Sequence, residues 1–204
     1  IGASWWGVAR LEEGLASRRF AQEGVPLYFM VPDGAEQIPG VIVAHGFSGS
    51  KQLMLGHGYT LARAGYAVML LDFAGHGANE QAMDTEGDAL QRSLDTAYRA
   101  LIEQPGVDAS RIALLGHSMG SGAVMRAGIE RPGRYQAVIA VSPTGADVSV
   151  TLPPNLMLQA GSLEGRFVDN ALELLAEAGG ANDDFAAGRA RTFEEIANVE
   201  HITI

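Results

Sequence analysis

One stretch of the chain, residues 112–120, reads IALLGHSMG. Its first half is a continuous apolar run, typical of a buried strand, and the residues after it begin a helical pattern. Between the two stands G-x-S-x-G, with Gly116 and Gly120 on either side of Ser118. A motif of this kind between a strand and a helix predicts a very tight turn with the serine hydroxyl at its apex. We interpret Ser118 as a nucleophile and the amide of Met119, at the helix N-terminus, as an oxyanion donor. The alternative is a glycine-rich turn with an incidental serine.

The rest of the chain alternates in the same way between short apolar runs and amphipathic helical patterns. Strands that are apolar on both faces and separated by helices indicate a mostly parallel sheet covered on both sides, an α/β three-layer sandwich. No repeat, low-complexity tract or linker interrupts it, so we expect one domain over residues 1–204. The expected strands are Val25–Val31, Val41–Ala44, Ala67–Asp72, Arg111–Leu115, Ala137–Val141, Asn155–Gln159 and Val199–Ile204. The expected helices are Trp6–Leu15, Lys51–Arg63, Thr85–Glu103, Ser118–Glu130 and Val168–Glu177.

The composition agrees with a globular chain, because 47% of the 204 residues are hydrophobic and 19% are charged. The formal net charge is −10 and no run of Lys or Arg exceeds two residues, which argues against binding to nucleic acid or to an anionic membrane. No apolar stretch is long enough to span a membrane. The chain has no cysteine, which excludes disulfides and thiolate metal sites and leaves the compartment open. We favour the cytoplasm slightly, with export after removal of an N-terminal segment as the alternative.

A serine hydroxyl needs a neighbouring base to act as a nucleophile near neutral pH. Hydrolases built on such a sheet carry serine, acid and histidine in that order, and His201 is the only one of five histidines that follows Ser118. The acid is expected beyond the next strands, where Glu164 comes three residues after a turn glycine. Asp169 and Asp147 remain alternatives. The histidines show no spacing typical of a metal site, so we expect no metal.

A second glycine-rich turn follows an earlier strand and begins His45-Gly46-Phe47. The oxygen of a tetrahedral intermediate needs two donors, and one of them usually comes from a loop in this position. The backbone amide of Phe47 is therefore our candidate for the second donor. An ordinary turn between a strand and a helix is the alternative.

Taken together, these motifs resemble those of the α/β-hydrolase superfamily, particularly its small esterases and dienelactone-hydrolase-like members. The matching blocks follow the family order over most of the chain. They are Pro39–Lys51, Asp72–Gly77, Gly116–Gly120, Gly161–Glu164 and His201.

The resemblance implies a serine hydrolase that cleaves a small-molecule carboxylic ester or related acyl bond, without cofactor or metal. It implies Ser118 as nucleophile, His201 as base and Glu164 as acid, with the amides of Phe47 and Met119 as oxyanion hole. The same triad would also serve a peptidase, a thioesterase or an acyltransferase. A hydrolase-like interaction module without catalysis is the alternative from another class.

The chain departs from the family pattern at two points. The acid of the family is usually Asp, whereas Glu164 stands here. The family also continues past the histidine with a helix that covers one face of the sheet, and this C-terminal helix is missing after His201. We expect a longer natural chain or a partner subunit, in a homo-oligomer, to cover that apolar face. The short connection between Val141 and Asn155 predicts an open active site with minimal or no cap.

Overall fold

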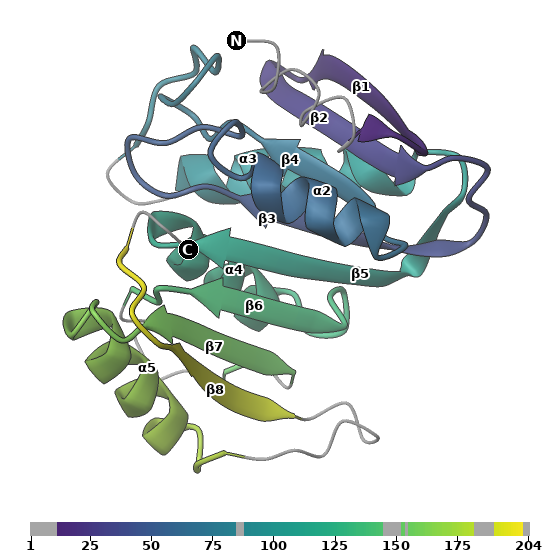
Figure 1. Ribbon diagram of the computed structural model, residues 1–204. Coiled ribbons are helices and arrows are strands. Elements are labelled where there is room, and N and C mark those ends of the chain that lie inside the picture. The colour runs from purple at the N-terminus through teal and green to yellow at the C-terminus, as the bar shows by residue number, and fades with distance from the viewer. Residues whose placement is uncertain (1–11, 85–87, 145–151, 154, 182–189, 202–204) are drawn as a thin grey trace, which may run out of the picture.

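The computed structural model describes residues 12–84, 88–144, 152–153, 155–181 and 190–201. One eight-stranded sheet in the order β1-β2-β4-β3-β5-β6-β7-β8 runs through the molecule (Figure 1). β1 and β2 form an antiparallel hairpin, β2 is antiparallel to β4, and all other neighbours are parallel. The strands are β1 (Leu15–Gln22), β2 (Val25–Pro32), β3 (Ile38–Ala44), β4 (Ala67–Leu71), β5 (Val107–His117), β6 (Ala137–Val141), β7 (Leu156–Gly161) and β8 (Arg191–Ile196). The helices are α2 (Leu55–Arg63), α3 (Asp88–Ile102), α4 (Met119–Glu130) and α5 (Arg166–Glu177).

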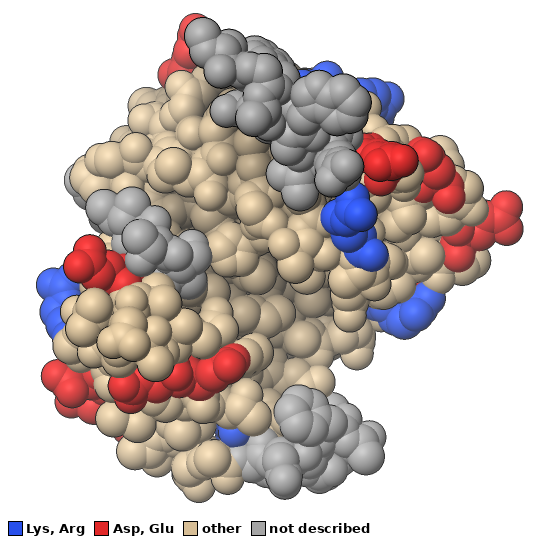
Figure 2. Space-filling model, viewed as in Figure 1, with Lys and Arg blue, Asp and Glu red and all other residues tan. Residues whose placement is uncertain are grey.

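Helices lie on both faces of this sheet. Buried residues of α3, α4 and α5 join one hydrophobic cluster with one face of the strands, whereas α2 joins a second cluster on the opposite face. In Figure 1, α2 lies in front of the sheet and α3 and α4 lie behind it, while the front of β5, β6 and β7 carries no described helix. Figure 2 shows that Lys and Arg side chains are scattered singly over this front face.

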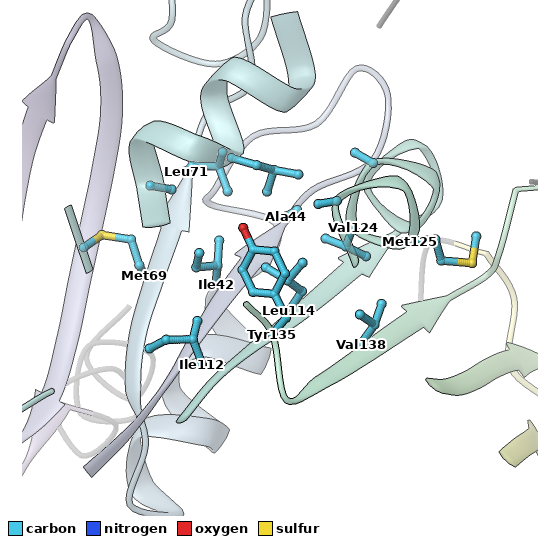
Figure 3. Close-up of a cluster of buried hydrophobic side chains, with 14 of the residues drawn as sticks. Ile42, Ala44, Met69, Leu71, Ile112, Leu114, Val124, Met125, Tyr135 and Val138 are labelled. Atoms are coloured by element: carbon cyan, nitrogen blue, oxygen red, sulfur yellow. The ribbon is translucent and has the colours of Figure 1, made fainter. Parts of the chain in front are cut away.

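The centre of the larger cluster lies where β3, β4 and β5 meet (Figure 3). Ile42 of β3 is opposite Met69 on one side and Leu114 on the other, and none of the three is exposed to solvent. Val124 of α4 packs in the same cluster. Full burial of one such side chain contributes about 1.5–3 kcal/mol to folding. This core holds β3 and β5 side by side, so the loops that follow them emerge together at one edge of the sheet.

The predicted three-layer α/β architecture, with a mostly parallel sheet between helical layers, is confirmed. The connection from β6 to β7 spans residues 142–155, and its described part contains no helix, consistent with a minimal cap. No helix in the described part of the chain is long and apolar enough to cross a membrane.

The predicted elements are wrong at both edges of the sheet. The last described strand is β8, Arg191–Ile196, and not Val199–Ile204: residues 199–201 belong to no strand, and 202–204 lie outside the described residues. The prediction failed because β8 reads RTFEEI, which carries three charged residues on an edge strand and lacks a continuous apolar run. The expected helix Trp6–Leu15 lies mostly outside the described residues, and its last residue begins strand β1. The predicted strand Arg111–Leu115 is only the centre of β5.

Candidate active site

The turn at Ser118 is as tight as the sequence predicts. Ser118 has φ +54° and ψ −119°, a backbone conformation that is strained for a residue with a side chain. A Cβ at Gly116 would lie 2.2 Å from the carbonyl oxygen of Gly120, and one at Gly120 would lie 2.6 Å from that of His45. Only glycine fits at these two positions. The amide of Ser118 donates to the carbonyl of Val141 at 2.9 Å, which ties the turn to β6.

The structure brings Ser118, His201 and Glu164 together. In the sequence, His201 comes 83 residues after Ser118 and 37 residues after Glu164. The Oγ of Ser118 lies 3.0 Å from Nε2 of His201. On the other side of the imidazole, Nδ1 lies 2.6 Å from Oε1 of Glu164. A neutral imidazole has one donor and one acceptor nitrogen. Because the carboxylate can only accept, Nδ1 carries the proton and Nε2 is left to accept from the serine hydroxyl.

The carboxylate of Glu164 is held by three donors. Besides His201, the hydroxyl of Ser142 donates to Oε2 at 2.9 Å, and the amide of Gly161 donates to the same oxygen at 2.5 Å. The side chain of Glu164 is fully buried. These donors replace the hydration that the carboxylate loses on burial, and they also fix the direction in which Oε1 points.

Two aromatic side chains flank the imidazole of His201. The ring of Phe167, from the first turn of α5, is stacked on it with centroids 4.3 Å apart. The ring of His117 lies 4.8 Å away, and its Nε2 donates to the backbone carbonyl of His201 at 2.9 Å. Burial is the main cause that lowers the pKa of His117, and the neighbouring imidazole of His201 lowers it further. His117 therefore stays neutral near pH 7. His117 thus has a structural role, because it binds the segment that carries His201.

The loop with Phe47 lies against the turn at Ser118. A Cβ at Gly46 would lie 3.1 Å from the Cβ of Ser118. In the described part of the chain, the amides of Phe47 and Met119 have no hydrogen-bond acceptor. The amide of Met119 is the first of α4, where no carbonyl of the helix can reach it. Two unpaired N–H groups on either side of a serine are suited to bind a developing oxyanion.

The structure describes one of the two alternative acids. Asp169 is exposed on the first turn of α5, and Asp147 lies outside the described residues. The sequence does not predict the contact of Ser142 with Glu164 or those of His117 and Phe167 with His201. Only the position of Ser142 could have been noticed, because it follows β6, and the neighbouring strand β5 ends at His117, just before Ser118.

Comparison with protein families and known proteins gives a consistent result. A family model described as serine aminopeptidase, S33, matches residues 36–192. The chain is 30% identical over 135 residues to the dihydrolipoyllysine-residue acetyltransferase component of the acetoin cleaving system of Cupriavidus necator, covering 66% of this chain and 34% of that protein. It is 28% identical over 138 residues to the sn-1-specific diacylglycerol lipase ABHD11 of Mus musculus, covering 64% and 43%. It is 27% identical over 126 residues to the bis(hydroxyethyl) terephthalate hydrolase of Streptomyces coelicolor, covering 62% and 39%. The chain therefore spans less than half the length of these curated relatives.

Solved structures share the fold. The dienelactone hydrolase of Anabaena variabilis superposes with a TM-score of 0.70 at 20% identity, covering 92% of this chain and 89% of that one. An α/β serine hydrolase without a lid from Xanthomonas campestris superposes with a TM-score of 0.68 at 21% identity, covering 93% and 86%. At this level of identity, the likeness establishes the arrangement of the elements and not the reaction.

Proposed function

Because the chain belongs to the serine aminopeptidase S33 family of α/β hydrolases, we propose that it is a serine hydrolase that cleaves carboxylic esters. Ser118 is the nucleophile, His201 the base and Glu164 the acid that orients it. The observation that carries this proposal is the unbroken series of contacts from Ser118 Oγ through both imidazole nitrogens to Glu164 Oε1. A nucleophile, a base and an orienting acid within hydrogen-bond reach are the requirements of acyl transfer through a covalent intermediate.

The reaction has two similar halves. Ser118 Oγ forms a bond to the acyl carbon while its proton passes to Nε2 of His201. The amides of Phe47 and Met119 stabilise the oxyanion of the tetrahedral intermediate. When the intermediate collapses, the bond to the alcohol breaks and the alcohol leaves with the proton from His201. Water then attacks the acyl-enzyme through the same steps and releases the acid and free Ser118.

Two observations favour an accessible ester as substrate. The β6–β7 connection is short, and the side chains of Phe47 and Leu163 are 70% and 60% exposed beside the two loops of the site. Two of the relatives carry names of ester-cleaving enzymes, a lipase and a terephthalate-ester hydrolase. Apolar side chains next to the reacting atoms favour an uncharged acyl or alcohol group.

Peptide hydrolysis is the second candidate, because the family description names an aminopeptidase and the same triad would attack an amide. A panel of p-nitrophenyl esters, thioesters and aminoacyl p-nitroanilides separates the two. The proposal requires the highest kcat/KM on the esters; a higher kcat/KM on the anilides would replace it with the peptidase.

Covalent labelling tests the triad directly. A fluorophosphonate probe reacts with serines that a working base and oxyanion hole have activated. We expect an adduct on Ser118 in peptide mass spectrometry, and no adduct in Ser118→Ala or His201→Ala. The exposed Ser110, whose hydroxyl donates to Asp108, supplies the matched control, and Ser110→Ala should label like the unaltered protein. A folded protein that does not label would contradict the proposal.

A further inference from the structure

A buried ion pair lies behind the loop that carries Phe47. The side chains of Lys51 and Asp72 are only 8% and 0% exposed. In every other ion pair between described residues, at least one side chain is more exposed than that of Lys51. Residues 45–51 form the first part of the loop between β3 and α2, with Lys51 at the end of this part, and Asp72 directly follows β4. Neither contacts the triad. Burial of two charges is costly, so such a pair is not explained by stability alone.

The carboxylate of Asp72 binds both the main chain and the side chain of Lys51. Oδ1 accepts a hydrogen bond from the backbone amide of Lys51 at 2.7 Å. Oδ2 accepts one from Nζ of Lys51 and another from the amide of Ala78, the latter at 2.9 Å. The carboxylate is enclosed so closely that a Cβ at Gly77 would lie 2.5 Å from its Cγ. Burial alone would raise the pKa of Asp72, but the bonds from Lys51 and Ala78 outweigh it and lower the pKa. Asp72 is therefore ionised at neutral pH.

The beginning of the same loop, at His45, is held by Phe73, the residue after Asp72. His45 is fully buried, and its Nε2 accepts the amide of Phe73 at 3.1 Å. Its Nδ1 donates to the carbonyl of Gly46 at 2.8 Å. Within the loop, the amide of Gly49 donates to the same carbonyl at 3.1 Å. Residues 46–50 are thus fixed at both ends by Asp72 and Phe73.

We propose that Asp72 and Lys51 are positioning residues that, together with His45, hold the amide of Phe47 in place for the oxyanion. This inference rests on the proposed function, because it concerns one donor of the oxyanion hole. An apolar pair of equal volume would fill the space, but directional bonds to the main chain of Lys51 set where the loop ends. An oxyanion donor contributes fully only when it is aimed in advance at the position of the developing charge.

Asp72→Asn tests the proposal, because it keeps the volume and removes the charge. We expect kcat on p-nitrophenyl butyrate to fall about a hundredfold, as for loss of one oxyanion donor, while KM changes less than about twofold. Binding of a trifluoromethyl ketone, which forms an anionic adduct with the serine, should weaken by a similar factor. Lys51→Met should also lower kcat. Because Lys51 and Asp72 act as a pair, the double variant should have nearly the same kcat as either single variant.

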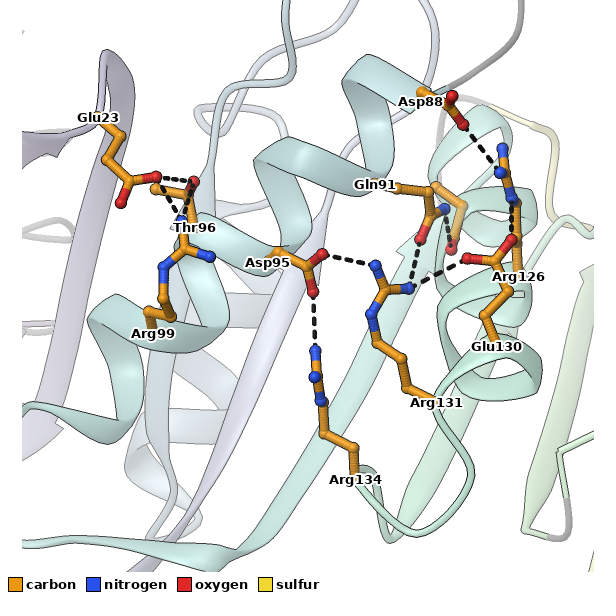
Figure 4. A network of polar contacts seen from close by, with 11 residues as sticks. Glu23, Asp88, Gln91, Asp95, Thr96, Arg99, Arg126, Glu130, Arg131 and Arg134 are labelled. Carbon is orange, nitrogen blue, oxygen red and sulfur yellow. Dashed lines mark hydrogen bonds and ion pairs between the residues drawn. The ribbon is translucent and has the colours of Figure 1, made fainter.

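Asp95 supplies the matched control, because it belongs to an ion-pair network between α3 and the end of α4 (Figure 4). It accepts from Arg131 at 2.5 Å and from Arg134 at 2.8 Å. Asp95→Asn should lower the melting temperature and leave kcat and ketone affinity unchanged. If Asp72→Asn behaves like Asp95→Asn while the unaltered protein labels at Ser118, the inference is overturned and the proposed function stands.

Hydrogen exchange keeps the inference testable if the unaltered protein shows no hydrolase activity. Amides of residues 46–53 should exchange faster in Asp72→Asn than in the unaltered protein or in Asp95→Asn. Unchanged exchange in this segment would overturn the inference whatever reaction the protein catalyses.

Discussion

The hydroxyl of Ser142 donates to the carboxylate of Glu164, the proposed acid, and Ser142 itself is fully buried. Its φ of +49° lies in the left-handed region, where a residue with a side chain is strained. Its amide also donates to the carbonyl of Gln159 at 2.7 Å, which ties β6 to β7 beside Glu164. Strain at this position is maintained by contacts that converge on the acid.

Ser142→Ala is expected to lower kcat about tenfold with little change in KM. Loss of a donor to a buried carboxylate costs about 1–3 kcal/mol, and about 1.4 kcal/mol corresponds to a tenfold change in rate. Steady-state kinetics and urea unfolding measure both effects. Ser93 is an equally buried serine, whose hydroxyl donates to the carbonyl of Ala89 in α3, so Ser93→Ala should affect stability alone. Equal kinetics in the two variants would contradict the role of Ser142.

The buried histidines make stability depend on pH. Burial lowers the pKa of both His45 and His117 below the ordinary value of 6.5. As the pH falls below 6.5, the unfolded chain binds protons that the folded protein does not, so the free energy of unfolding decreases. This loss continues until the pH reaches the lowered pKa of the folded state. Urea unfolding between pH 7.5 and 5 should show it, and His117→Gln should reduce the slope. An unchanged slope in His117→Gln would contradict the assignment.

At the scale of elements, β3 and β5 determine where the site forms. Their parallel register pairs Ala44 with Gly116, so the loop of Phe47 and the turn of Ser118 leave the sheet side by side. The carboxyl ends of neighbouring parallel strands are the usual place for a ligand site in an open α/β sheet. β3 is buried from Val41 to Ala44 and β5 from Leu114 to Gly116, next to the site, which fixes their register.

Leu114→Ala is expected to lower the free energy of unfolding by about 2–5 kcal/mol, because it leaves a cavity in a fully packed core. Leu114 is fully buried opposite Ile42. Leu172 of α5 is 49% exposed, so Leu172→Ala should change stability by less than about 0.5 kcal/mol. Chemical unfolding of the two variants measures the difference. A small effect of Leu114→Ala would place the core elsewhere.

At the scale of the whole molecule, one face of the sheet is covered unevenly. Beside α2, the front of β5, β6 and β7 forms a groove of about 670 Å³, and Figure 2 shows mainly uncharged atoms there. Its lining is mostly apolar and includes Leu61, Leu115, Ile139 and Met157. Apolar surface of this kind typically marks an interaction site. Coverage by a partner subunit or by a further segment of the chain stays a prediction.

The groove should bind an apolar dye. We expect anilinonaphthalene sulfonate to fluoresce strongly with the native protein, because uncovered apolar surface excludes water from the bound dye. Met157→Lys places a charge in the groove and should remove most of this signal without changing esterase kinetics. Leu172→Lys, on exposed α5, is the control and should leave the signal unchanged. Strong fluorescence that persists in Met157→Lys would locate the dye at another surface.

By itself, the sequence determined the features that depend on local chemistry. Apolar runs such as Val41–Ala44 and Ala67–Leu71 indicate buried strands, and the glycines around Ser118 leave the room that a tight turn needs. The order of motifs along the chain was sufficient to propose Ser118 and His201. These features could be predicted because burial and backbone sterics act on neighbouring residues.

Only the tertiary structure decided which distant groups meet. The edge strands β1 and β8 carry polar and charged residues, so their pairing partners and not their composition make them strands. In the sequence Glu164 is one of three candidate acids, and only the tertiary structure shows that its Oε1 lies 2.6 Å from Nδ1 of His201. The contacts of Ser142 with Glu164 and of Asp72 with Lys51 join separate loops. Such contacts depend on how strands are ordered in the sheet, which no local pattern of residues encodes.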